Sequence, residues 1–128
     1  MQGAGTNAQP FKTVADYDAW LARAGLVPVL FDQAIANMRE GMKAGVVQPK
    51  ALMLKVIPQL DAIINEDPAK TTFWGPITNM PKEFSAEDQK RLTEAYRVMI
   101  AEQLMPAYKR LRAFIADEYL PATRESVS

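Results

Sequence analysis

Histidine and cysteine, the side chains that most often serve as bases, nucleophiles and zinc ligands, are both missing from this sequence. A zinc peptidase needs imidazole or thiolate ligands and an open position for water, and no such set can be assembled from these residues. A serine hydrolase needs a base beside its nucleophile, so Ser85, Ser126 and Ser128 lack an activating partner. We therefore expect no catalytic residue, no metal site and no cofactor in this chain.

Two pairs of adjacent carboxylates remain as candidates for acid–base chemistry: Glu87 with Asp88, and Asp117 with Glu118. Two carboxyl groups that flank one sugar could hydrolyse a glycosidic bond. Adjacent residues of a helix point about 100° apart, however, so their side chains do not converge on one substrate. We interpret the first pair as residues favoured at a helix N-terminus by the backbone dipole, and the second pair as solvated.

A basic cluster near the C-terminus could bind an anion. It consists of Lys109, Arg110 and Arg112, close to the end of a predicted helix. The helix dipole favours positive charge there, but arginine forks also suit carboxylates and other anions. Together with Arg124, these residues are the candidate anion or partner contacts.

An apolar seam follows the same helix at helical spacing, through Leu104, Tyr108, Leu111 and Ile115. Such spacing is more often packed core than a ligand pocket. We treat these four residues as a candidate packing interface.

The composition is that of one globular domain. The chain has 128 residues, of which 48% are hydrophobic, and its fifteen basic and fifteen acidic residues cancel. Because no basic stripe is present, nucleic acid is not an expected partner. No apolar run approaches the roughly 20 residues that a membrane helix needs, so no membrane span is expected. Residues 1–12 are predicted to be a flexible lead-in, and residues 13–128 a single helical domain.

Hydrophobic periodicity predicts helices over residues 14–24, 28–44, 49–64 and 86–119. Thr13 and Ser85 are the expected N-caps, and Pro121 is expected to end the last helix. Residues 65–84 contain several prolines and predict an irregular connection. Its large apolar side chains should pack against the helices: Phe73, Trp74, Ile77 and Met80.

Gly41 lies inside the second predicted helix, where glycine costs roughly 1 kcal/mol relative to alanine. The interpretation we favour is close approach of another helix.

The last predicted helix is long for a chain of this size. At about 50 Å it exceeds the roughly 36 Å diameter of a compact chain. Either Pro106 bends it sharply, or its distal half packs on something outside this chain. The second possibility predicts that the isolated chain self-associates.

Two segments resemble a known family: residues 40–50, Glu-Gly-Met-Lys-Ala-Gly-Val-Val-Gln-Pro-Lys, and residues 105–124, which contain Pro-Ala-Tyr and end in Glu-Tyr-Leu-Pro-Ala-Thr-Arg. Together they resemble the N-terminal helical part of the bacterial domain-of-unknown-function family 885. The resemblance implies a relative of the zinc metallopeptidases, whose His-Glu-x-x-His helix lies much further along the chain. It maps no catalytic residue onto this sequence, and it implies that this region is a helical wall beside the catalytic half.

These observations predict an all-α fold, an antiparallel helical bundle with a long, Pro-bent C-terminal helix. We expect the chain to be a fragment of a larger protein: a non-catalytic scaffold or substrate-wall segment of a metallopeptidase-like protein. The alternative is a free-standing helical interaction module that binds through its Met-rich and Tyr-rich faces. The expected partner is the missing C-terminal part of the same protein or a second copy. The sequence does not identify the cellular compartment. The family resemblance implies that the parent protein is exported, either to the periplasm or as a lipoprotein.

Overall fold

The fold is all-α. A computed structural model describes residues 11–124, and this part of the chain contains no β-strand. Its helices and helical turns are α1 (Val14–Ala24), α2 (Val27–Lys43), α3 (Lys50–Ile63), the 3₁₀ turns η1 (Pro68–Lys70) and η2 (Thr72–Trp74), α4 (Gly75–Thr78), α5 (Ala86–Val98), the π-helical turn η3 (Met99–Leu104), α6 (Met105–Phe114), the π-helical turn η4 (Ile115–Tyr119) and α7 (Leu120–Arg124).

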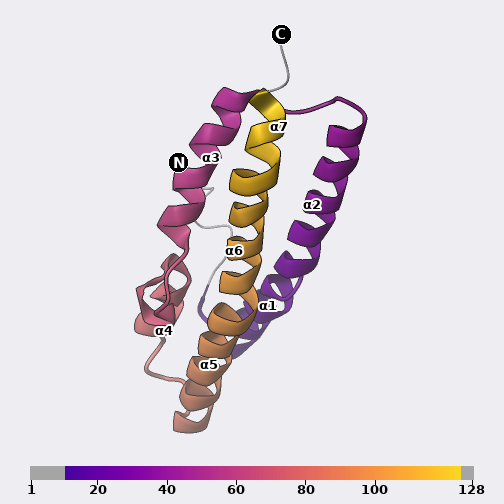
Figure 1. Cartoon of the computed structure of the whole chain (residues 1–128). Helices are drawn as coiled ribbons and strands as arrows, with labels where there is room; N and C mark the ends of the chain where they lie inside the picture. Colours follow the sequence, from indigo (N-terminus) through magenta and orange to yellow (C-terminus); the bar gives the residue numbers. More distant parts are fainter. Residues whose placement is uncertain (1–10, 125–128) are drawn as a thin grey trace, which may run out of the picture.

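The segments from α5 to α7 follow one another as one long helix, with α2 and α3 on either side of it (Figure 1). Contacts with α2 move up the long helix as the chain advances, from Asp32 with Arg110 to Arg39 with Glu118, so these two helices are parallel. Contacts with α3 run in the opposite sense, from Gln48 just before it with Tyr119 to Asp61 near its end with Arg112, so α3 is antiparallel to both. The predicted antiparallel bundle is confirmed.

The start of α1 follows its predicted capping. The Thr13 hydroxyl accepts a hydrogen bond from the Asp16 amide at 3.1 Å, and the Asp16 carboxylate accepts one from the Thr13 amide at 3.0 Å. These backbone bonds to the charged form hold the pKa of Asp16 below its usual range. α1 ends at Ala24, but Gly25 is right-handed helical, so the chain re-enters helix at Val27 after one turn.

Val14–Lys43 can be counted as one stretch of 30 helical residues, with a mean hydropathy of 1.2 in its most apolar window. By length and composition alone, this stretch could cross a membrane, as could the core helices of many soluble proteins and many signal sequences. The sequence-based expectation of no membrane span did not consider this stretch as one helix. Three of the charged residues in this stretch form ion pairs with the long helix: Asp18, Asp32 and Arg39.

The end of α2 explains both of its glycines. Gly45 has a φ of 76°, its N–H donates to the Met42 carbonyl at 3.1 Å, and the Val46 N–H donates to the Gly41 carbonyl at 2.8 Å. This hydrogen-bond pattern is a Schellman cap. A Cβ on Gly41 would lie 2.7 Å from the Val46 carbonyl oxygen. The close approach predicted at Gly41 is therefore real, but the neighbour is the turn that follows α2, not another helix.

Each proline of the long helix follows a π-helical turn. The Met105 N–H donates to the Ile100 carbonyl, and the Leu120 N–H donates to the Ile115 carbonyl, five residues back in both cases. A proline in a regular α-helix clashes with the carbonyl four residues before it, and the wider turn accommodates the ring. The prediction that Pro121 ends the helix is therefore wrong, because α7 continues to Arg124. Figure 1 also shows that α5, α6 and α7 continue in one direction and that the long helix does not fold back.

The core consists of three clusters along the long helix. The first lies between α2, α3 and the C-terminal part of the long helix, and includes Ile35, Met53 and Phe114. The second surrounds Ile100 and Leu104, and the third surrounds Tyr17, Leu92 and Tyr96. The predicted packing of the irregular segment is confirmed, because its apolar residues join the second and third clusters: Phe73, Trp74, Ile77 and Met80.

Candidate functional site

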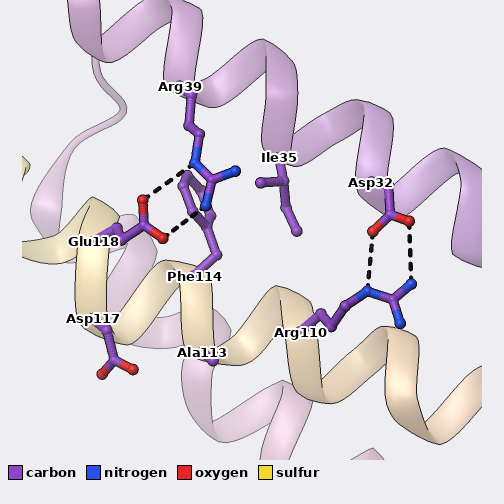
Figure 2. A pocket seen from close by; sticks show the side chains of 8 residues that line it. All are labelled: Asp32, Ile35, Arg39, Arg110, Ala113, Phe114, Asp117 and Glu118. Atoms are coloured by element: carbon purple, nitrogen blue, oxygen red, sulfur yellow. Dashed lines mark hydrogen bonds and ion pairs between the residues drawn. The ribbon is translucent and has the colours of Figure 1, made fainter.

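A groove of about 460 Å³ lies between α2 and the α6–η4 part of the long helix (Figure 2). We call it the α2–α6 groove. Its lining combines apolar residues with charged residues of both signs: Asp32, Ile35, Arg39, Arg110, Ala113, Phe114, Asp117 and Glu118.

Two arginine–carboxylate pairs cross the groove. Arg110 donates from Nε and Nη2 to the two carboxylate oxygens of Asp32 at 3.1 and 3.2 Å. Arg39 donates in the same way to Glu118 at 3.2 and 2.7 Å. Figure 2 shows both forks, with Ile35 between them. Because all four side chains are about half exposed, solvent screens each pair, and its contribution to stability is expected to be small.

The spacing of the charges explains the pairing. On α2 the acid Asp32 precedes the base Arg39 by two turns, whereas on the long helix the base Arg110 precedes the acid Glu118 by about the same distance. Since the two helices are parallel, each acid meets a base. The Arg39 guanidinium also lies 5.1 Å from the centre of the Phe114 ring, a distance at which a cation is attracted to an aromatic face.

The contact between Arg39 and Glu118 shifts the pKa of both groups. Hydrogen bonds from Arg39 hold the pKa of Glu118 below its usual range, and the same contact raises the pKa of Arg39. Both groups therefore keep their charges near neutral pH. Residues 11–124 contain no group of three or more acidic side chains that could hold a metal ion. In this structure the two arginines and two of the carboxylates neutralise one another across the groove.

The predicted basic cluster is not gathered at one site. Arg110 turns to Asp32 on α2, whereas Arg112 donates to Asp61 on α3 at 2.6 and 3.2 Å, and Lys109 donates to Glu66 at 2.7 Å. The three side chains thus reach from α6 to different neighbours. The side chain of Arg124 lies outside the described residues.

The predicted packing interface lies largely inside the single chain. Leu104 and Ile115 are 1% and 2% exposed and belong to the core. Tyr108 and Leu111 are half-buried against it, and the Tyr108 ring meets the Phe31 ring edge-on at 4.9 Å.

The first carboxylate pair and Ser85 take the expected roles at a helix N-terminus, whereas Glu118 of the second pair is not simply solvated, because it pairs with Arg39. Asp117 and Glu118 diverge, since only Glu118 reaches Arg39 (Figure 2). Glu87 and Asp88 lie in the first turn of α5, whose cap is the Ser85 hydroxyl, 3.0 Å from the Asp88 amide. Ser126 and Ser128 lie outside the described residues.

Sequence reasoning missed the groove residues Asp32, Arg39 and Glu118 as a site. The available signal was the matched spacing of opposite charges on two predicted helices. It could be used only once those helices were known to be parallel.

Comparison with known proteins gives one match. The family described as "Bacterial protein of unknown function (DUF885)" matches residues 1–127, which is almost the whole chain. Neither the curated proteins nor the solved structures that were compared gave a match.

Proposed function

The chain belongs to the bacterial family of unknown function DUF885, and from this premise we propose that it is a non-catalytic helical scaffold. In this proposal it forms a wall beside the substrate in a larger, metallopeptidase-like protein. The charged groove and the buried core give it a fixed surface, while the chemistry belongs to residues elsewhere in the parent protein.

One observation carries the proposal: large apolar side chains remain exposed although the core is packed. Leu26, Val29 and Leu30 are 57%, 66% and 62% exposed. A second set lies on α3 and the loop before it, at Val46, Leu52 and Leu54. Clustered exposed apolar residues usually mark a surface that another protein segment covers, which is what a scaffold segment requires.

The first test compares the isolated chain with the complete product of its reading frame. We expect the isolated chain to hold no zinc after dialysis and to hydrolyse no peptide, and the complete product to hold one zinc per molecule. Stoichiometric zinc in the isolated chain, or a complete product that is itself free of zinc, would overturn the proposal.

The second test asks whether the α2–α6 groove belongs to the wall. In the complete product, Arg39→Gln should raise KM several-fold and leave zinc content and kcat unchanged, because it alters a surface that meets substrate and no reacting group. The matched control is Arg97→Gln, because Arg97 pairs with Glu94 within α5 and lies outside the groove. Equal effects of both substitutions would exclude the groove.

The second candidate function is a free-standing helical interaction module. The same exposed residues favour it, because an apolar helix face can bind a partner helix or peptide. A stop codon directly after Ser128 would select this function over the scaffold.

A further inference from the structure

A second hollow, of about 150 Å³, lies where the α1–α2 junction, η2 and the long helix meet. We call it the aromatic pocket. Three separate parts of the chain line it, through one charged residue, Arg23, and six others: Trp20, Ala24, Val27, Phe73, Leu104 and Tyr108. Ala24 and Leu104 are core residues, 6% and 1% exposed, so the pocket reaches down to the core.

Two of the three aromatic walls, Trp20 and Tyr108, pack against rings outside the pocket, and the third, Phe73, packs against both of them. Trp20 stacks on Tyr96, with 4.6 Å between ring centres and 16° between planes. Tyr108 packs edge-on against Phe31. Phe73 lies between the walls, 6.1 Å from the Trp20 ring and 6.1 Å from the Tyr108 ring. Because the walls are already ordered, a ligand would lose little binding free energy to arranging them.

Two polar groups of the pocket wall, the Tyr108 hydroxyl and the Trp20 indole N–H, differ from the other buried polar groups in their hydrogen bonding. Of the four tyrosines, Tyr17 and Tyr96 donate to backbone carbonyls at 2.8 and 2.9 Å, and Tyr119 accepts from a backbone amide at 2.7 Å. The Tyr108 hydroxyl makes no hydrogen bond within the described part of the chain, and neither does the indole N–H of Trp20. Desolvation raises the pKa of Tyr108, which keeps the hydroxyl neutral and able to donate.

We propose that the aromatic pocket binds one aromatic ring that carries a hydrogen-bonding oxygen, with the Tyr108 hydroxyl as its polar contact. An apolar cavity of about 150 Å³ is large enough for benzene. Aromatic walls favour stacked and edge-on rings, and a single well-placed polar group gives a ligand its orientation. A free small phenol and the tyrosine side chain of a peptide share this chemistry.

This inference is independent of the proposed scaffold role. Every residue that it uses lies in the described chain, and no metal or downstream segment is needed. A failure here would leave the zinc and KM tests untouched, and their failure would leave the pocket intact.

The experiment is a titration of the chain with p-cresol, followed through the two indole N–H signals in ¹H–¹⁵N NMR spectra. We expect a saturable shift of the Trp20 signal with a Kd of about 1 mM, the affinity typical of such a small ligand. Trp74, which does not line the pocket, serves as the internal reference, and Trp74→Phe assigns the signals. No saturable shift of Trp20, or equal shifts of both indoles, would overturn the proposal.

The hydroxyl contact is tested with toluene, which has the ring but no oxygen. Tyr108→Phe should weaken p-cresol binding about five-fold, the value of one net hydrogen bond, and leave toluene binding unchanged. An equal loss for both ligands would show that Tyr108 supplies only packing, which contradicts the proposed polar contact.

The location is tested with two identical substitutions on α2. Val27→Phe places a ring in the pocket and should abolish p-cresol binding, whereas Val29→Phe, at a position that is 66% exposed and outside the pocket, should preserve it. Binding that survives Val27→Phe would place the ligand elsewhere and overturn the proposal.

The source of the ring is distinguished with N-acetyl-tyrosine amide. A site for a peptide side chain should bind this compound at least as tightly as p-cresol, because the pocket is open to the surface beside the ring. A site for a free small phenol should bind it at least five-fold more weakly. Either result supports the ring pocket, provided that Val27→Phe abolishes the binding.

Discussion

At the residue scale, single atoms decide what a position tolerates, and Gly41 is the clearest case. A Cβ atom added to Gly41 would lie only 2.7 Å from the Val46 carbonyl oxygen. That oxygen belongs to a backbone held by the hydrogen bond from Val46 to Gly41, so it cannot move as a flexible side chain would. Gly25 is a helical glycine without this constraint, since its nearest neighbours would lie at 3.6 Å or more from an added Cβ.

The first prediction compares alanine at these two glycines. Gly41→Ala should lower the free energy of unfolding by about 1–3 kcal/mol, because overpacking outweighs the gain in helix propensity. Gly25→Ala should leave it unchanged or raise it by up to about 1 kcal/mol. Urea unfolding followed by circular dichroism measures both. A Gly41→Ala variant as stable as Gly25→Ala would remove the steric explanation of the glycine pair.

The second prediction compares two tyrosines that differ in their hydroxyl partners. Tyr96 is 0% exposed and donates to the Tyr17 carbonyl, and burial strongly raises its pKa. Tyr96→Phe should therefore cost about 1 kcal/mol or more. Tyr108→Phe removes a hydroxyl without an intramolecular bond and should change the stability by less than about 0.5 kcal/mol. If both variants lost the same stability, hydrogen bonding would not be the cause.

At the element scale, ion pairs set how the helices are aligned, and pH tests them. Arg39 lowers the pKa of Glu118. A carboxylate with a lowered folded-state pKa contributes stability above its unfolded-state pKa and loses it as the pH falls through the folded value. Glu118→Gln should thus melt below the parent at neutral pH. The difference should shrink as the pH falls below the ordinary glutamate value of 4.5. Thermal melts across this pH range, on the parent, Glu118→Gln, Arg39→Gln and the double variant, measure the interaction energy of the pair. If the difference in melting temperature between Glu118→Gln and the parent does not depend on pH, its cause is packing and not the ion pair.

The same scale shows how far the sequence could predict this protein. Helix starts were predictable because their signals are local, as at Thr13 and Ser85, where a hydroxyl caps the next residues. The continuation of the helix past Pro121 was not predictable. It depends on a π-helical turn before the proline, in which the Leu120 N–H bonds to the Ile115 carbonyl, and the residue types do not indicate this turn. The α2–α6 groove depends on the parallel alignment of segments about 78 residues apart, which follows from the whole chain and not from either helix.

At the scale of the whole molecule, other elements of the chain pack along both halves of the long helix. α1 packs against α5 and α2 against α6, so α1 and α2 together cover most of its length. The candidate packing interface is covered largely within the single chain, as the burial of Leu104 and Ile115 indicates. Exposed apolar side chains of the described residues lie instead at the start of α2, at Leu26, Val29 and Leu30, which share one helix face.

The last prediction follows from this arrangement and concerns the isolated chain. Without a covering segment, two copies should associate through the start of α2, since exposed apolar clusters tend to find a partner and identical surfaces can pair about a two-fold axis. Sedimentation equilibrium should detect a dimer that Leu30→Glu disrupts and that the same change at an exposed leucine of α3, Leu54→Glu, leaves intact. Leu111→Glu should mainly lower the melting temperature, because that side chain packs against the core. A parent chain that stays monomeric at high concentration rules the dimer out, and a dimer that survives Leu30→Glu must use another face.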